Sequence, residues 1–360
     1  MKKNLLLTLL IILAGNAFAQ SLKTENIILI TLDGMRWQEV FNGGDSSFMR
    51  QQKYLKDEKI KEKFWRSDLN ERRKALLPFF WNTLATKGQL YGNRELGCKV
   101  NVSNNQWFSY PGYSEILTGQ ADNERIHSND KFYNPNTNVL EFINSQNAFK
   151  GKVAAFSSWD VFPYIINDKR SGVTVSGGLE KAQGNNLTER EKTMNDIMMR
   201  IPNPLGDVRL DAFTFYYGLE YMKKNKPRVM YFAFDETDDF AHAGEYPAYL
   251  NSAHNTDRFI EELWNFIQSD PAYKNKTTMI LTCDHGRGTN AEDWKHHGIK
   301  INAADQIWMG VIGPDTPAKG EVKGECQYYQ NQVAQTMAAF LGLQFKSDKA
   351  VGEAMFTMLK

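Results

Sequence analysis

The sequence predicts an α/β fold with a mostly parallel central sheet that is flanked by helices on both faces. Apolar runs rich in β-formers alternate along the chain with segments of helical periodicity. Continuous apolar runs such as 27–30 are typical of strands that are covered on both faces. The 360 residues are 42% hydrophobic and 24% charged, which is the composition of an ordinary globular protein able to build a large core.

Five apolar runs are the candidate strands of this sheet, because each is short and bounded by turn-forming residues. They cover residues 26–32, 152–157, 228–234, 277–282 and 306–312. Between or after them, helical periodicity predicts helices near 78–87, 138–148, 208–224, 248–268 and 328–341. The sequence thus alternates strands and helices in the order that a parallel sheet requires.

Two polar segments interrupt this alternation. The segment 45–75 is dense in charge and is interpreted as a solvated helical insertion after the first strand, and 185–204 is expected to form a loop or lid. Neither internal repeats nor a clear linker are found, so residues 20–360 are predicted to form one domain with insertions.

The N-terminus has the pattern of a secretory signal peptide. A basic head is followed by an apolar run of nine residues, 5–13, and by small residues at Ala17 and Ala19. The apolar run is too short to cross a bilayer. We therefore expect residues 1–19 to be removed, Gln20 to become the new N-terminus, and the mature protein to be exported to the periplasm or secreted without a transmembrane anchor. An uncleaved membrane anchor is the alternative.

Charge and cysteine content exclude several classes of function. The formal net charge is +1, so the chain lacks the basic excess that is typical of nucleic-acid-binding proteins. Cys98, Cys283 and Cys326 lack Cys-x-x-Cys spacing and are too few for a disulfide scaffold. If one pair is bridged, Cys98 with Cys326 is the preferred choice, because Cys283 lies in an apolar stretch and is interpreted as core.

Acidic and imidazole side chains follow three of the candidate strands at their carboxyl ends. Asp33 follows the first strand, a segment ending in His242 follows 228–234, and Asp284-His285 follows 277–282. His297 comes shortly afterwards. In open α/β sheets ligands bind at the carboxyl ends of strands, and a divalent cation commonly neutralises such a cluster. Mixed Asp and His ligands favour zinc, with manganese or iron as alternatives.

The motifs taken together resemble the alkaline phosphatase superfamily, in particular its type I phosphodiesterase/nucleotide pyrophosphatase branch. The resemblance spans about residues 26–313 in the order of the family and rests on Leu32-Asp33-Gly34, Ser109-Tyr110-Pro111-Gly112-Tyr113-Ser114-Glu115-Ile116-Leu117-Thr118-Gly119, Asp238-x-x-Ala-His242, Asp284-His285-Gly286 and His297-Gly298. Ala241 stands where the family commonly has glycine. The sulfatase signature Cys-x-Pro-x-Arg is absent.

The resemblance implies two metal sites and one nucleophile. One metal would be held by Asp238, His242 and His297, and the other by Asp33, Asp284 and His285, with Ser109 facing both. Two assignments stay open, because His296 could replace His297, and Asp235 or Asp239 could replace Asp238. Only Asp238 has the i, i+4 spacing to His242.

Ser109 is the candidate nucleophile. It precedes Tyr110-Pro111, and proline favours the first positions of a helix, so Ser109 is expected just before a helix that runs through Thr118. The N–H groups and dipole of a helix N-terminus attract anions. Because a serine hydroxyl is a weak nucleophile, activation by metal coordination is expected. A simple helix cap is the alternative function of Ser109, and Ser114 is the weaker competing nucleophile.

Three further residues are candidates for substrate binding. Asn129 resembles the asparagine that contacts a phosphate oxygen in the phosphodiesterase branch. Arg36 and Arg287 follow Asp33 and His285 closely and could direct guanidinium groups at a phosphate, or they could form salt bridges of the scaffold. Aromatic residues around Ser109 are interpreted either as a wall for the leaving group or as core: Trp107, Phe108, Tyr110 and Tyr113.

These expectations combine into an exported, metal-dependent phosphoric ester hydrolase. It would act on a small-molecule phosphate ester, a monoester or a diester, through a phosphoserine intermediate beside two divalent ions, with zinc preferred. The alternatives are a phosphoglycerate mutase-like or phosphotransferase member of the same superfamily, or a non-catalytic metal-binding relative. Export disfavours the mutase, and the missing transmembrane helices disfavour the transferase.

Overall fold

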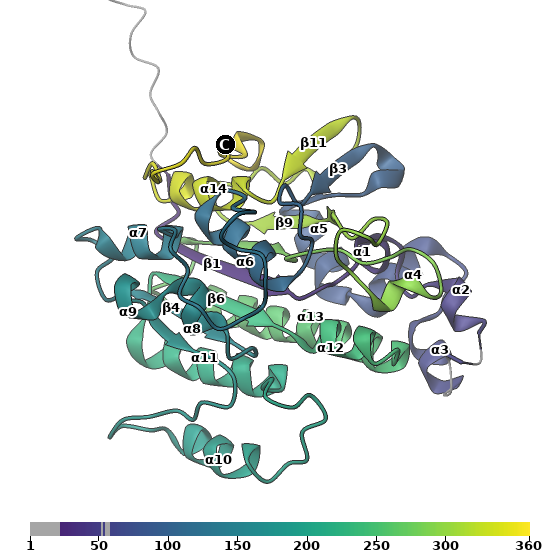
Figure 1. Cartoon of the computed structure of the whole chain (residues 1–360), viewed down its shortest axis with the longest axis horizontal. Coiled ribbons are helices and arrows are strands. Elements are labelled where there is room, and N and C mark those ends of the chain that lie inside the picture. The colour runs from purple at the N-terminus through teal and green to yellow at the C-terminus, as the bar shows by residue number, and fades with distance from the viewer. Residues whose placement is uncertain (1–21, 52, 55–57) are drawn as a thin grey trace, which may run out of the picture.

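An eight-stranded, mostly parallel sheet forms the centre of the protein, flanked by helices (Figure 1). The computed structural model describes residues 22–51, 53–54 and 58–360, so the predicted signal peptide 1–19 lies outside the described residues. In spatial order the strands are β10 (Gly320–Glu321), β2 (Gln89–Tyr91), β9 (Met309–Ile312), β7 (Thr277–Thr282), β1 (Asn26–Leu32), β6 (Val229–Phe234), β4 (Val153–Ser157) and β5 (Thr174–Ser176).

The five strands β7, β1, β6, β4 and β5 are neighbours and all run parallel. Every residue of β1, β6 and β7 is buried, as expected of strands that are covered on both faces. Strand β9 pairs antiparallel with β7 and with β2. The predicted fold class is therefore confirmed.

Helices cover both faces of this sheet. Figure 1 shows α6 (Ser109–Thr118), α7 (Val139–Ser145) and α14 (Gln332–Phe340) on one side. On the other side lie α11 (Asp211–Asn225), α12 (Glu236–His242) and α13 (Tyr246–Ser269). Short helices occupy connections: α1 (Trp37–Asn42), α5 (Ala85–Lys87), α8 (Phe162–Ile166), α9 (Asp168–Ser171) and the 3₁₀ turns η3 (Arg94–Leu96), η4 (Asp293–Lys295) and η5 (Phe356–Met358).

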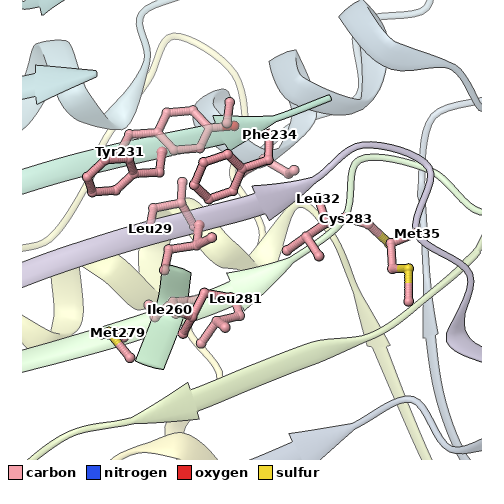
Figure 2. Packing of buried hydrophobic residues seen from close by; sticks show 14 of the residues in the cluster. Leu29, Leu32, Met35, Tyr231, Phe234, Ile260, Met279, Leu281 and Cys283 are labelled. Atoms are coloured by element: carbon pink, nitrogen blue, oxygen red, sulfur yellow. The ribbon is translucent and has the colours of Figure 1, made fainter. Parts of the chain in front are cut away.

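Apolar side chains from the central strands and from α13 pack together beneath the sheet edge that carries the polar residues. Figure 2 shows Leu29 of β1, Tyr231 of β6 and Leu281 of β7 within this cluster, together with Ile260 of α13. Leu29 pairs with Tyr231 on one side and with Ile280 on the other. Because these side chains are almost wholly removed from water, their burial favours this register of the three strands.

The charged insertion is helical, as predicted. It contains α2 (Ser46–Met49), α3 (Glu58–Phe64) and α4 (Leu69–Leu76). The insertion is only partly solvated, because Phe48 and Phe64 are fully buried whereas Leu69 is exposed. The segment 185–204 contains α10 (Glu189–Met198), which begins with a capping box formed by Thr188 and Glu191. A role of this segment as a lid stays a prediction.

Three predicted elements differ from the observed ones. The helix expected at 78–87 is present over that range, but its central part is the π-helix η2 (Phe80–Leu84), which α5 follows. The strand expected at 306–312 is divided at Trp308 into β8 (Gln306–Ile307) and β9. The start of the helix expected at 328–341 is instead strand β11 (Cys326–Tyr329), and α14 begins only at Gln332.

Long-range pairing explains the last two differences. A second sheet of three strands places β3 (Cys98–Asn101) between β11 and β8. Strand β8 leaves the main sheet to pair with β3, and β11 pairs with the other edge of β3 in parallel register. Cys98 and Cys326 face each other in this register and form the disulfide that was preferred from the sequence, while Cys283 is a buried free cysteine.

No helix within the described residues combines the length and the apolar character of a bilayer-spanning segment.

The disulfide is expected to stabilise the protein by restricting the unfolded chain, since it links cysteines that are 228 residues apart. We predict that the Cys98→Ser/Cys326→Ser variant loses about 2–4 kcal/mol in free energy of unfolding. Guanidinium denaturation of the oxidised protein and of the variant measures this loss, and coinciding midpoints would contradict the prediction.

Candidate active site

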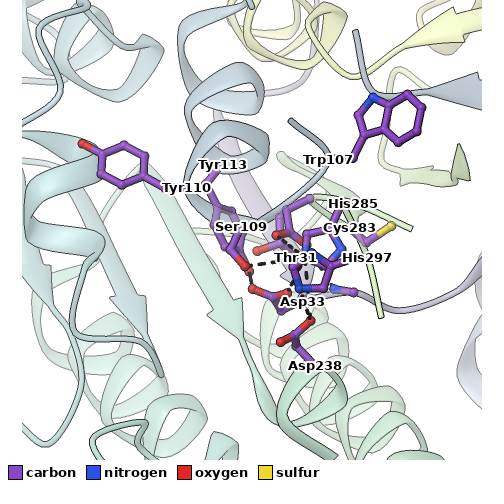
Figure 3. A network of polar contacts seen from close by, with 12 residues as sticks. Thr31, Asp33, Trp107, Ser109, Tyr110, Tyr113, Asp238, Cys283, His285 and His297 are labelled. Carbon is purple, nitrogen blue, oxygen red and sulfur yellow. Dashed lines mark hydrogen bonds and ion pairs between the residues drawn. The ribbon is translucent and has the colours of Figure 1, made fainter. Parts of the chain in front are cut away.

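The carboxyl ends of β6, β1 and β7 meet at one edge of the sheet and bring the predicted residues together. Asp33 follows β1 directly, α12 carrying Asp238 follows β6, and Asp284 and His285 follow β7. Figure 3 shows Asp33, Asp238, His285 and His297 clustered beside Ser109. The cluster forms because β1 pairs in parallel with both of its neighbours.

A first group that could hold a metal ion consists of Asp238, His242 and His297. Asp238 and His242 lie one turn apart on α12, with 3.1 Å between Oδ2 and the His242 Nε2. The Nε2 atoms of His242 and His297 are 2.9 Å apart. These three residues are those expected from the sequence for the first metal.

A second group consists of Asp33, Asp238 and His285, so Asp238 belongs to both groups. The His285 Nε2 lies 3.3 Å from Asp33 Oδ1 and 3.7 Å from Asp238 Oδ1. Asp284, which was expected here, lies with Oδ2 at 3.4 Å from the same nitrogen, and its Oδ1 accepts a hydrogen bond from the backbone of Gly34. Asp284 therefore joins the β7 end to the β1 end while one of its oxygens faces His285.

The alternatives left open by the sequence occupy different positions. His296 is exposed, whereas His297 is partly buried and touches His242. Asp235 and Asp239 flank Asp238, but the residue that contacts His242 and His285 in both groups is Asp238. The geometry favours His297 and Asp238.

The electrostatics of the cluster favour a cation. Burial lowers the pKa of His285, but Asp284 and Asp33 outweigh it and raise this pKa to about 9. Burial and the neighbouring His285 lower the pKa values of His297 and His242. Asp33 Oδ1 and Asp284 Oδ2 are buried without a hydrogen-bond partner among the described residues. Unpaired carboxylate oxygens beside imidazole nitrogens are suitable ligands for divalent metal ions, so the residues fit such a group.

Ser109 is the first residue of α6, one position later than expected, and Phe108 precedes the helix. Its Oγ lies 3.5 Å from the His285 Nε2, and the residue is 7% exposed. Gly112 allows α6 to lie close to the segment that carries Asp284 and His285, because a Cβ at this position would lie 2.3 Å from the carbonyl oxygen of Asp284. The competing Ser114 is buried elsewhere on the helix, where its Oγ accepts a hydrogen bond from Asn134.

Asn129 lies at the N-terminus of α6. Its Oδ1 accepts a hydrogen bond of 3.0 Å from the backbone N–H of Tyr110, the residue after Ser109. The side chain is exposed, so its amide nitrogen remains to donate to a ligand beside Ser109.

The two arginines form salt bridges inside the protein, which is the alternative that the sequence left open. Arg287 pairs with Asp238 and donates a hydrogen bond of 2.9 Å to the carbonyl oxygen of Lys295. Arg36 pairs with Glu39 at 2.9 Å and donates to the carbonyl oxygen of Gly288. Both arginines are only 1% exposed, and their hydrogen bonds join segments that carry candidate ligands; binding of a substrate by them stays a prediction.

Sequence reasoning missed two residues that orient Asp33. Tyr113 donates a hydrogen bond of 2.8 Å to Asp33 Oδ2, and Thr237 donates to the Asp33 carbonyl oxygen. Tyr113 lies one helical turn after Ser109 and hence on the same face of the helix, and this spacing could have indicated from the sequence that Tyr113 lies near the site. Tyr110 stacks on Phe132 at 4.7 Å in the core, so neither tyrosine forms a wall for a leaving group. Hydrogen-bond partners such as Tyr113 and Thr237 fix the orientation of a ligand side chain.

A model of a known protein family matches most of the chain. The family model described as type I phosphodiesterase / nucleotide pyrophosphatase matches residues 40–332. This range includes every candidate ligand except Asp33. No curated protein sequence gives a significant match.

Solved structures share the fold at low sequence identity. The alkaline phosphatase PafA superposes with a TM-score of 0.59 at 11% identity, covering 94% of this chain and 99% of its own. A phosphonate monoester hydrolase from Silicibacter pomeroyi gives 0.56 at 12% identity and covers 93% and 76% of the two chains. A putative sulfatase from Bacteroides thetaiotaomicron gives 0.59 at 10% identity and covers 93% and 74%.

Because Asp238 belongs to both groups, its loss should affect metal binding more than the loss of His242. We predict that Asp238→Asn lowers zinc binding at both groups, whereas His242→Ala retains about one zinc per chain. Metal analysis after gel filtration measures the content. Equal zinc content in the two variants would show that the groups do not share this residue.

Metal binding at the group containing His285 should depend on pH. His285 must lose a proton to bind a metal, so with a pKa of about 9 its affinity should rise about tenfold per unit between pH 7 and 9. The first group should show no such slope, because the pKa values of its histidines are lowered and both are already neutral. Chelator competition at several pH values, carried out on His242→Ala and His285→Ala, separates the two groups; parallel slopes would contradict the assignment.

Proposed function

The chain belongs to the type I phosphodiesterase / nucleotide pyrophosphatase family, and from this premise we propose that it is an exported, metal-dependent phosphoric ester hydrolase. It forms a phosphoserine intermediate on Ser109. The observation that carries the proposal is the position of the Ser109 hydroxyl at the N-terminus of α6, 3.5 Å from the Nε2 of His285 in the second ligand group.

We propose that two divalent ions, preferably zinc, are held by the two groups. Asp238, His242 and His297 would hold one ion, and Asp33 and His285, with Asp238 or Asp284, would hold the other. Bound ions would supply positive charge that lowers the pKa of the serine hydroxyl and stabilises charge on the phosphate oxygens.

The chain's own residues then bind and turn over the ester. In the first step the Ser109 Oγ loses its proton and forms a bond to phosphorus, while the bond from phosphorus to the leaving alkoxide breaks and that alkoxide takes up the proton to leave as the alcohol. The N-terminal turn of α6 and the Asn129 amide face the phosphate oxygens. In the second step water adds to phosphorus, the bond to Oγ breaks, and Ser109 regains its proton. Two in-line displacements leave the configuration at phosphorus retained.

Two features support export. The N-terminal residues have the pattern of a signal peptide, and the Cys98–Cys326 disulfide is stable in oxidising compartments.

Rates of hydrolysis test whether the protein prefers phosphate monoesters or diesters. Turnover of a nitrophenyl phosphate monoester and of its methyl diester by zinc-loaded protein gives the preference, and turnover of neither would contradict the proposed function. A nitrophenyl sulfate serves as the third substrate, and we expect it to be hydrolysed least, because the sulfatase signature is absent.

The role of Ser109 is tested by removing its hydroxyl. We predict that Ser109→Ala retains its zinc content while turnover falls by about three orders of magnitude or more, because the attacking atom is lost. Ser114→Ala is the matched control, since its hydroxyl lies on the same helix but accepts from Asn134. Ser109→Ala with near-normal turnover, or Ser114→Ala without turnover, would place the nucleophile elsewhere.

A further inference from the structure

Glu115 lies on α6 two turns after Ser109 and is fully buried. Its carboxylate accepts four hydrogen bonds, all from two residues that precede the helix. Ser103 donates from its backbone N–H and its hydroxyl, both at 2.8 Å. Asn104 donates from its backbone N–H at 2.7 Å and from its side-chain amide at 2.8 Å. Every hydrogen bond that the carboxylate makes with the described residues therefore holds one short segment.

Asn104 passes this constraint on toward the nucleophile. Its Oδ1 accepts from the backbone N–H of Gln106 at 2.9 Å and of Trp107 at 3.1 Å. Its carbonyl oxygen accepts from the Trp107 indole at 2.8 Å. Three hydrogen bonds that Asn104 accepts thus hold the backbone up to two residues before Ser109.

The path that these bonds hold is one that the backbone seldom adopts without support. Trp107 has a φ of +55°, in the left-handed region that a bulky side chain disfavours. Figure 3 shows the Trp107 side chain turned away from the cluster, so it makes no contact there that would impose this conformation. Two hydrogen bonds that Trp107 donates to Asn104 support this conformation, and the Trp107 backbone also interacts with the imidazole of His297.

We propose that Glu115 is a positioning residue that acts through Asn104 to hold the segment 103–108, and thereby the Ser109 hydroxyl, against the metal-ligand cluster. The inference depends on the proposed function only in taking Ser109 as the nucleophile. Glu115 itself touches neither Ser109 nor any candidate ligand in the hydrogen bonds and ion pairs of the described residues. Its effect is transmitted through the segment that precedes α6. The close packing of α6 against Asp284 depends instead on Gly112.

Replacing Glu115 by glutamine keeps the size of the side chain but turns one acceptor into a donor. The amide group must then face either Ser103 or Asn104, each of which presents N–H donors, so at least one bond is lost. We expect kcat to fall on the order of ten- to a hundredfold with KM and zinc content unchanged, because small displacements of a reacting atom cost this much. Asn104→Ala should act in the same direction, and it tests the inference if Glu115→Gln does not fold.

Asp257 offers a matched control. It is also a fully buried carboxylate that accepts two backbone N–H groups, those of Phe79 at 2.8 Å and Phe80 at 3.0 Å, where a helix begins. None of these partners belongs to the cluster. Asp257→Asn should lower the melting temperature without changing kcat. If it lowers kcat as much as Glu115→Gln does, the effect of Glu115 is one of general stability and the inference is wrong.

Hydrogen exchange provides a readout that does not require turnover. Amide exchange measured by mass spectrometry should accelerate in residues 103–108 of Glu115→Gln while the peptide covering 112–118 keeps its protection. Unchanged exchange in 103–108 would overturn the inference whatever the rates are. If the wild-type protein hydrolyses none of the phosphoric esters, the proposed function fails, and the exchange result still decides whether Glu115 holds the segment.

Discussion

The site depends on the parallel pairing of β1 between β6 and β7. Leu32 is in register with Phe234, and Thr31 with Thr282, so the residues that follow the three strands leave the sheet at the same level. A slip of one residue would turn the buried side chains of a strand to the other face and displace the acidic residue that follows it. The apolar cluster around Leu29, Tyr231 and Leu281 prevents this slip. The hydrophobic core therefore determines where the carboxylates meet.

Bringing carboxylates together in a buried place is unfavourable unless each is held by partners. The structure supplies these partners from different elements: Tyr113 of α6 for Asp33, the Gly34 backbone for Asp284, and Arg287 for Asp238. Arg287 also bonds the backbone of Lys295 and so ties α12 to the segment that carries His297. Asp33 Oδ1 and Asp284 Oδ2 remain without a hydrogen-bond partner among the described residues, and they lie 3.3 and 3.4 Å from His285 Nε2, so they are available to a metal ion.

The sequence predicted the features that depend on local pattern. Strands β1 and β7 have the predicted bounds, and the acidic residues and histidines lie at the strand ends where parallel pairing requires them. Features that depend on distant partners were not predictable. Nothing in the apolar run 306–312 shows that β8 leaves the sheet to pair with β3, and Cys326–Tyr329 is extended only because β3 lies beside it. The sharing of Asp238 by two groups and the inward turn of Arg36 and Arg287 likewise arise from tertiary packing.

Anomalous diffraction from zinc-loaded crystals tests the account most directly, because it locates the metal without reference to activity. The account predicts two zinc peaks beside the Ser109 hydroxyl, one in contact with His242 and His297 and one in contact with Asp33 and His285. Zinc found only at histidines outside the cluster, such as His296 or His127, would contradict it. A single zinc that does not contact Asp33 and His285 would also contradict it.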